Sequence, residues 1–566
     1  MTPTENDEQE SDDFPSLRPH LSTWWAWSMK HVLLCGLLAL FFAMLNWFPI
    51  RCTDIWGHVH YGHWILDHGQ LPAEDPFVPL AQGVRIVDSA WLSQVIFASV
   101  ERMGGAEALS SLYAITVTVT YVFIGLMIFR HSHRFSLTIL GTFLVLVMAS
   151  TRLLVIRPEI FGGLSFALLI LLTMTVRRNA TKEDSASEHG PTSWFSKWGF
   201  YAGVLLIFLF WGNAHGSFPV GLVFLGCLLL GRIVEVGWTT RSPAKVLADA
   251  TMRRWLFALE LAVVGTLINP YGIDSLINAV TFSSNPNLRD IQEWAAMHTR
   301  SFEGLWILMS VIIMLFVFRH SRLCITPADV LLLSVFGIAT IFNVRMAIWY
   351  AFVFGMVIIP HLHELLSRRW PVELPDPARE ETDEDLPGGI WGRTYYHTLV
   401  CGLFFWCSFA LSPISQPILG GDGRKPEQLY SDDTPLGVTN YLRENPPSGQ
   451  IWNPQWWGDW LAWQGPENLK VFMTTMSIHA TPPQVWRDYM MIASANGNWQ
   501  RHLEKYRVTT LVIDKTRQTQ LDRQARRMSG WSRAYEDEQA LVLTRDPALL
   551  KNIKQTENKR STKSNP

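Results

Sequence analysis

The sequence predicts a polytopic α-helical membrane protein of about eleven transmembrane helices, followed by a small C-terminal α/β domain. Of its 566 residues, 48% are hydrophobic and only 17% are charged, and apolar runs recur as far as residue 411. Soluble domains average about 25% charged residues, and a helix needs about 20 apolar residues to cross a bilayer. After residue 412, short strand-like and helix-like patterns alternate, which is typical of an α/β domain.

Four regions follow from this division. We expect residues 1–28 to be a disordered cytoplasmic tail because they are acidic and polar. Residues 29–411 form the predicted transmembrane domain, with a first outward loop at 51–91. Residues 412–550 form the extracytoplasmic α/β domain, and the polar residues 551–566 are again expected to be disordered. The expected spans are 31–50, 106–129, 136–151, 159–176, 199–211, 217–236, 255–268, 302–318, 327–342, 347–366 and 396–411.

Positive charge is concentrated in every second loop between these spans. The basic loops contain Arg130 and Arg134; Arg177, Arg178 and Lys197; Arg232, Arg241, Lys245, Arg253 and Arg254; Arg319 and Arg322; and Arg368 and Arg369. The positive-inside rule places such loops in the cytoplasm. The sequence therefore predicts a multi-pass protein of the cell inner membrane, with a cytoplasmic N-terminus and an extracytoplasmic C-terminal domain.

The C-terminal region alternates four candidate strands with four candidate helices. The strands are expected at 450–452, 470–473, 509–513 and 540–544, and the helices at 458–463, 483–493, 499–506 and 518–528. The region contains no glycine-rich phosphate loop, so nucleotide binding is not indicated. The net charge of -2 gives no reason to expect a nucleic-acid partner.

The first outward loop is unusually rich in acids, histidines and tryptophans, ending near Trp91. Asp54 directly follows the first span, at the N-cap position of a short amphipathic helix expected at 55–67. Helix capping alone would explain Asp54. A carboxylate near a low-dielectric membrane can, however, be tuned into a general base. Asp54 and Asp75 are therefore the candidate catalytic residues, with Trp91 and His58 as candidate substrate contacts.

A divalent-cation site is a second interpretation of this loop. Asp54 and His58 are four residues apart, and His60 and His63 are three apart, spacings that share a helical face. Histidine and carboxylate suit a divalent ion. Because no recognised metal motif is present, we favour interfacial histidines that bind water and lipid headgroups, and we assign no metal ligands.

Polar residues at the outward ends of other spans are further candidates for substrate binding. Arg157 could hold a lipid-linked phosphate, since guanidinium grips phosphate bidentately, or could pair with Glu159. His215 could contact phosphate or simply hydrogen-bond to its own turn. Arg345 could bind phosphate or anchor to headgroups. Glu293 lies in an outward loop, where a solvated acid is the simpler explanation.

Tryptophans also crowd the C-terminal region, around Asp459 in the stretch WWGDWLAW at 456–463. Stacked indoles can hold the apolar faces of sugar rings. A hydrophobic helix packed against the membrane portion is the alternative that we favour.

The order of several short motifs resembles the GT-C superfamily of membrane glycosyltransferases. The stretches are TDIWGHVHYGHWILDHGQLPAEDPF at 53–77, RPEIFGG at 157–163, WGNAHGSF at 211–218, NPYG at 269–272, IQEW at 291–294, NVRMA at 343–347 and WWGDWLAW at 456–463. The resemblance implies transfer of a sugar from a polyprenyl-phosphate-linked donor to a glycan, lipid or protein acceptor, with inversion. It also implies that the first-loop acid, here Asp54, is the base. Many members carry adjacent acids there, whereas Ile55 follows Asp54, so Asp75 remains the alternative.

Two other classes of membrane protein are alternatives to a glycosyltransferase that is in contact with membrane lipids. A transporter or flippase of a lipid-linked glycan would place ionisable residues near mid-span. Those of this chain sit at span ends. A membrane scaffold without catalysis would leave the acid- and histidine-rich loop unexplained.

Overall fold

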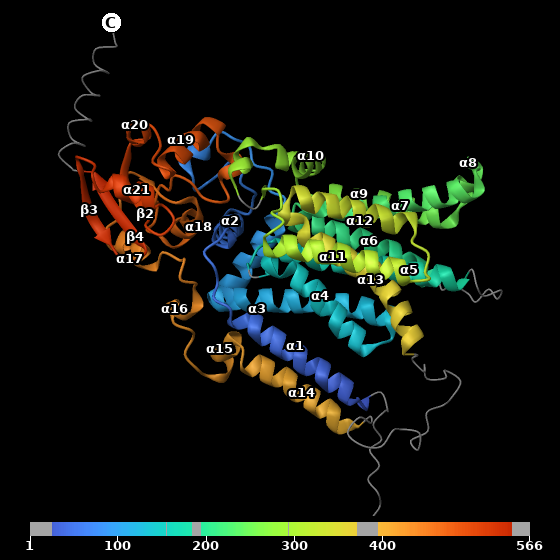
Figure 1. Cartoon of the computed structure of the whole chain (residues 1–566). Helices are drawn as coiled ribbons and strands as arrows, with labels where there is room; N and C mark the ends of the chain where they lie inside the picture. The colour runs from blue at the N-terminus through green and yellow to red at the C-terminus, as the bar shows by residue number, and fades with distance from the viewer. Residues whose placement is uncertain (1–24, 154, 184–193, 292–293, 371–393, 546–566) are drawn as a thin grey trace, which may run out of the picture. The chain divides into compact units, whose positions relative to one another are not determined.

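The computed structural model describes residues 25–153, 155–183, 194–291, 294–370 and 394–545 (Figure 1). The predicted disordered tails therefore lie mostly outside the described residues. Two compact units are present, one formed by residues 1–41 and 374–411 and the other by the remainder of the chain. In the first unit, the start of α1 meets α14 through a bridge between Trp27 and Thr394, and Gly36 lies against Phe404.

Each of the eleven predicted spans coincides with a helix. These helices are α1 (Met29–Trp47), α3 (Trp91–Ser132), α4 (Phe135–Leu153), α5 (Glu159–Glu183), α6 (Trp194–Ala214), α7 (Phe218–Thr240), α9 (Ala250–Leu267), α11 (Phe302–His320), α12 (Pro327–Phe342), α13 (Ala347–Arg369) and α14 (Tyr395–Ala410). Seven are long and apolar enough to cross a membrane, and α6 and α12 are shorter apolar helices. The predicted polytopic helical fold is confirmed.

The helix α3 is divided by a glycine pair. Gly104 and Gly105 leave helical geometry, and Gly105 has a φ of 62°, a value that side chains with a Cβ rarely adopt. The break lies directly before the predicted span at 106–129. The part of α3 that precedes it is therefore free to follow the first loop instead of the membrane helices.

The short helix α2 (Ile55–His68) confirms the amphipathic helix predicted in the first loop, and it packs against both α3 and α18 (Gln455–Gln464). Two glycines allow the close approach. A Cβ at Gly62 would overlap the carbonyl of Gln94, and one at Gly57 would overlap the carboxylate of Asp459. Trp56 is buried between Trp460 and Tyr430, with ring centroids 5.0 and 5.6 Å away.

The C-terminal region forms a four-stranded sheet in the order β1-β2-β4-β3, in which β1 and β2 are parallel and the other neighbours antiparallel. The strands are β1 (Gln450–Trp452), β2 (Val508–Asp514), β3 (Trp531–Glu536) and β4 (Ala540–Arg545). The predicted strand at 470–473 is wrong, because that segment is irregular and only its Lys470 carbonyl binds β1. The edge strand β3 escaped prediction.

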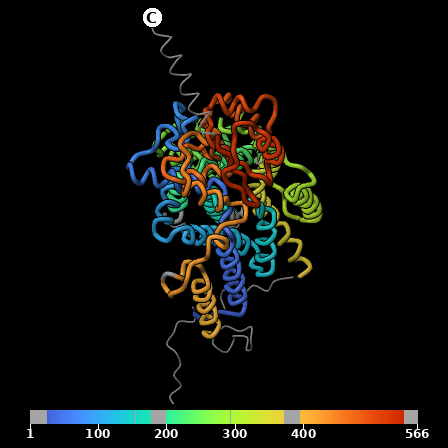
Figure 2. Tube along the Cα trace, turned by 90° about the vertical axis from the view of Figure 1, so that its left-hand side faces the viewer, coloured from blue at the N-terminus to red at the C-terminus, as the bar shows by residue number. Residues whose placement is uncertain are grey.

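Several helices surround this sheet and connect it to the membrane helices. They are α15 (Gln416–Leu419), α16 (Pro426–Leu429), α17 (Leu436–Glu444), α19 (Pro483–Ala493), α20 (Trp499–Lys505) and α21 (Thr519–Ala525), while α8 (Pro243–Ala248) and α10 (Ile273–Thr281) belong to the loops of the bundle. The C-terminal segment, orange to red, gathers beyond one end of the long helices of the second unit in Figure 1, and it faces the viewer in Figure 2. Asn287, after α10, donates hydrogen bonds to the carbonyls of Ile478 and Thr481, which fixes the segment to the bundle loops.

Packing of α7 on α12 offers a direct test of this arrangement. A Cβ at Gly231 would overlap the backbone of Ala328, whereas Gly226 on the same helix has no atom within 4 Å of that position. Gly231→Ala should therefore destabilise the protein by about 1–3 kcal/mol through overpacking. Gly226→Ala should leave the unfolding midpoint of the detergent-purified protein equal or slightly higher. Equal midpoints for the two variants would contradict the packing.

Candidate functional site

The first feature of the site is an ion pair between the first loop and the loop before α5. Asp54 occupies the N-cap position of α2, yet its side chain makes no capping hydrogen bond. Instead its Oδ1 accepts a 2.8 Å hydrogen bond from Nε of Arg157, and the two side chains are only 19% and 13% exposed. Capping alone is therefore the wrong explanation for Asp54.

A second ion pair lies beside the first. Arg152, at the end of α4, donates to Glu159 at the start of α5 over 2.5 Å, and both side chains are nearly buried. Glu159 also interacts electrostatically with Arg345 and His215. Arg345, from the turn before α13, lies over the ring of Trp294 at 4.7 Å. Three separate loops thus bring three arginines and two acids together.

Three histidines line the same cluster and are kept neutral. Burial lowers the pKa of His58 to about 4, an effect that Asp54 opposes and that Arg157 and His479 reinforce. Burial likewise lowers the pKa of His215 to about 4, against the attraction of Glu159. His479 is lowered to a pKa of about 4 by burial alone. Neutral imidazoles can accept or donate a hydrogen bond without adding charge.

The C-terminal segment contributes an acid to this site. Asp459 on α18 is 1% exposed, and its Oδ2 accepts a 2.8 Å hydrogen bond from the backbone N–H of Thr475. Burial, together with the negative charge of Asp54, raises the pKa of Asp459 to about 7. From the sequence, Asp459 stands out only as the centre of a tryptophan cluster. A lone acid inside an otherwise apolar aromatic run was the signal that could have marked it.

The tryptophans around Asp459 mainly serve packing, as favoured from the sequence. Trp457 and Trp460 are buried, and the Trp460 indole N–H donates to Thr439. Trp456 donates to Asp514 and lies 5.3 Å from the guanidinium of Arg517. These contacts fix α18 in place, which in turn holds Asp459 against α2.

Other predicted residues lie apart from the ion pairs. Asp75 is 1% exposed, and its Oδ1 accepts two 2.9 Å hydrogen bonds from the backbone N–H groups of Phe77 and Val78. Burial raises the pKa of Asp75, opposed by these hydrogen bonds and by Tyr61. These hydrogen bonds, to backbone N–H groups two and three residues later, stabilise a turn of the loop. Glu293 lies outside the described residues.

The histidines of the metal interpretation are engaged elsewhere. His60 stacks on Phe77, with ring centroids 3.4 Å apart. Nε2 of His63 lies 2.7 Å from Glu101, and its ring stacks on Trp463. Within the described part of the chain, no group of three or more His, Cys, Asp or Glu side chains is arranged to hold a metal ion.

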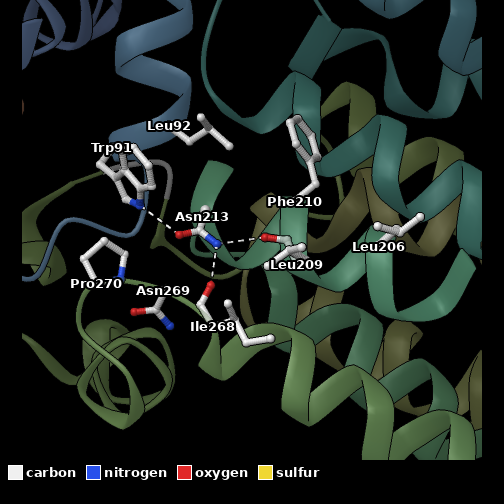
Figure 3. Close-up of a pocket in the computed structure, with 9 residues that line it drawn as sticks. All are labelled: Trp91, Leu92, Leu206, Leu209, Phe210, Asn213, Ile268, Asn269 and Pro270. Atoms are coloured by element: carbon white, nitrogen blue, oxygen red, sulfur yellow. Dashed lines mark hydrogen bonds between the residues drawn. The ribbon is translucent and has the colours of Figure 1, made fainter. Parts of the chain in front are cut away.

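An apolar cavity of about 630 Å³ opens next to the cluster of arginines and acids (Figure 3). It is lined by Trp91, Leu92, Leu206, Leu209, Phe210, Asn213, Ile268, Asn269 and Pro270. Trp91 donates a 2.9 Å hydrogen bond to Asn213, whose amide donates to the carbonyls of Leu209 and Ile268. Asn213 is two residues before His215, so the cavity and the charged cluster meet in the turn between α6 and α7.

The opposite ends of the helices carry arginines from the predicted basic loops. Arg134 between α3 and α4 donates to Ser367 on α13, and Arg368 donates to the carbonyl of His320 at the end of α11. Arg134 and Arg368, which belong to two of the predicted basic loops, thus lie at the end of the helices away from the charged cluster. The fold and the cluster together define a polytopic membrane protein with a polar site at one end of its helices.

Comparison with known proteins supports this class at the level of fold. No family model and no curated protein sequence matches the chain. The solved structures with similar folds include the oligosaccharyltransferase AglB from Archaeoglobus fulgidus, in complex with an inhibitory peptide and a dolichol-phosphate (TM-score 0.52, 10% identity, 87% of this chain and 69% of that chain). ArnT from Cupriavidus metallidurans bound to undecaprenyl phosphate is also similar (TM-score 0.50, 11% identity, 94% and 99%). The chain therefore shares its overall fold with these two solved structures.

The neutral histidines predict an acid-sensitive site. Because the folded state lowers their pKa from 6.5 to about 4, their stabilising contribution is complete above pH 6.5 and is lost as the pH falls through 4. His215→Gln should therefore reduce the fall of the unfolding midpoint over this range, by the equivalent of about 1–3 kcal/mol. The exposed His68, replaced in the same way, is the control. Identical pH profiles for His215→Gln and the wild type would contradict the assignment.

Proposed function

We propose that the chain is an integral membrane glycosyltransferase. It would transfer a sugar from a polyprenyl-phosphate-linked donor to a glycan, lipid or protein acceptor. The observation that carries the proposal is the Asp54–Arg157 pair, which sets a potential base beside a potential phosphate ligand at the polar end of a GT-C fold. Structures of this fold hold dolichol-phosphate and undecaprenyl phosphate, which supports a lipid-phosphate donor.

The arginines supply the phosphate-binding chemistry. Arg157, Arg152 and Arg345 converge from two loops, and guanidinium groups bind phosphate oxygens bidentately. With Asp54 and Glu159 ionised, the three arginines leave one positive charge in excess. An arriving phosphate would therefore find both hydrogen-bond donors and a favourable potential.

Asp54 would act as the general base of a single displacement. The acceptor oxygen or nitrogen forms a bond to the anomeric carbon and gives its proton to the Asp54 carboxylate. The bond from that carbon to the phosphate oxygen breaks, and the lipid phosphate leaves with the electron pair. Attack from the side opposite the leaving group inverts the anomeric centre. While Arg157 holds Asp54, the carboxylate is a weaker base; transfer of the guanidinium to the donor phosphate would release it.

The cavity beside Trp91 fits the lipid part of such a donor. Its wall is predominantly apolar, while Asn213 and Asn269 mark its polar side next to the turn that carries His215 (Figure 3). A polyprenyl chain would be buried there while its phosphate reached the arginines. The basic loops at the other end of the helices support a cytoplasmic position for that end. We therefore propose that the site lies on the outer face of the inner membrane.

The central experiment compares Asp54→Asn with the wild type. Purified protein is incubated with a panel of polyprenyl-phosphate sugars, and release of the lipid phosphate is measured. Loss of a general base should lower kcat by about 100-fold or more. Asp67→Asn, which removes an exposed acid from the other end of α2, should change kcat by about twofold at most.

Two outcomes would count against the proposal. Equal turnover of Asp54→Asn and the wild type would remove Asp54 from catalysis, and Asp75→Asn would then be the next variant to measure. Uptake of a glycolipid into protein-containing vesicles, without turnover of any donor, would favour a transporter.

The role of the cavity is tested by narrowing it. Leu206 lines the cavity and is 62% exposed, so Leu206→Trp should add bulk to the cavity without disturbing the core. We expect KM for a long polyprenyl donor to rise by about tenfold, because the loss of burial for about two CH₂ groups costs about 1.4 kcal/mol. A donor with a very short lipid chain should be unaffected. Leu140→Trp, at an exposed apolar position of α4 outside the cavity lining, is the control; equal effects on both donors would contradict the proposal.

A further inference from the structure

Asp459 has an unusual hydrogen-bonding state for a buried acid. Its Oδ2 accepts from the N–H of Thr475 at 2.8 Å, but Oδ1 has no hydrogen-bond partner among the described residues. Oδ1 points at the first turn of α2, because a Cβ added to Gly57 would overlap it. Gly57 is three residues after Asp54, so both lie on the same side of this turn.

The surroundings of Asp459 determine which of the two acids is charged. Asp54 already has a cationic partner, because Nε of Arg157 lies 2.8 Å from its Oδ1. Two neighbouring carboxyl groups in a buried site do not both ionise readily, and no cationic side chain contacts Asp459 within the described part of the chain. Cys52 and Tyr61 also lie near Asp459, and burial raises the pKa of both groups, so both are neutral.

The hydrogen bonds also locate the proton. A protonated carboxyl has one carbonyl oxygen, which accepts, and one hydroxyl oxygen, which can donate. Because Oδ2 already accepts from Thr475, it is the carbonyl oxygen. The proton then belongs on Oδ1, the oxygen that faces α2 and Asp54.

We propose that Asp459 is a positioning residue of the transfer site, a neutral carboxyl whose Oδ1–H group donates a hydrogen bond to the Asp54 carboxylate or to the acceptor oxygen held there. This inference rests on the proposed function. The hydrogen bond would steady Asp54 when Arg157 turns to the donor phosphate. Ionisation of Asp459 would remove that donor and add a second negative charge to a site that must admit an anion. Activity would thus require correct docking of α18 on α2.

Donor binding measured against pH tests the role. In the wild type, KM for the donor should rise about tenfold as the pH increases from 6 to 8.5, because Asp459, with a pKa of about 7, loses its proton in this range. Asp459→Asn keeps a neutral hydrogen-bond donor, so its KM should stay flat and its activity at pH 6 should remain within about threefold of the wild type. Asp459→Ala should be weak at every pH. Asp488→Asn removes a buried acid elsewhere in the segment, where it contacts Lys505, and should retain the wild-type profile.

Unfolding measurements test the proton without any reaction. The folded state raises the pKa of Asp459, so its stabilising effect is complete below about pH 4 and is lost as the pH rises through about 7. The unfolding midpoint of the wild type should therefore fall relative to that of Asp459→Asn between these values. Parallel midpoints, or an alkaline rise in KM that persists in Asp459→Asn, would overturn the inference. Wild-type activity in Asp54→Asn would instead overturn the proposed function, while the unfolding comparison still decides whether Asp459 holds its proton.

Discussion

Close packing of α2 between α3 and α18 is the constraint on which the site depends. Gly57 and Gly62 lie five residues apart, and each faces a group that a methyl would strike. With both partners in contact, the start of α2 is fixed between the membrane helices and the C-terminal segment. Asp54 and His58 can then face groups from other loops, and Asp459 reaches them from about four hundred residues further along the chain. A looser α2 would separate these groups, since hydrogen bonds and ion pairs act only over a few ångströms.

Electrostatics gives this packed junction its chemical character. The arginines and acids are nearly buried, where an unpaired charge is costly, so the resting site must supply its own counter-ions. Arg157 with Asp54 and Arg152 with Glu159 satisfy this requirement. Burial keeps the histidines neutral, which prevents the positive charge from growing further. The result is a site with a small positive excess, suited to exchanging an internal carboxylate for a phosphate anion.

The parts of the fold that could be predicted are those that produce a pattern within a short stretch of sequence. Each membrane helix produces its own long apolar run, and α2 shows its own amphipathic spacing, so both could be placed from sequence alone. The sheet was harder, because β3 is an edge strand with exposed Ser532 and Arg533 and lacks a buried strand pattern. The segment at 470–473 is as buried as a strand, yet its residues pack beside β1 without continuing the ladder.

The site was even less predictable than the sheet, because its residues meet only in the tertiary structure. Asp54, Arg157, His215 and Arg345 were each singled out as candidates because a polar residue at the end of an apolar run stands out. Their pairing was not predictable, since nothing local distinguishes Arg152 from Arg157 as the partner of Asp54. Asp459 was missed as a site residue because its role depends on a contact across the tertiary structure.

The pairing itself constrains how such a site can work. An ion pair that was permanent would make Asp54 a poor base, and an Asp54 with no partner would be costly to bury. The arrangement avoids both problems if the guanidinium has a second anion to bind during turnover and the carboxylate has a second donor to hold it. The arginine cluster provides for the first, and a proton on Asp459 provides for the second. Substrate binding and base activation are then one event, because the donor phosphate releases the base only when it occupies the place from which its sugar can be transferred.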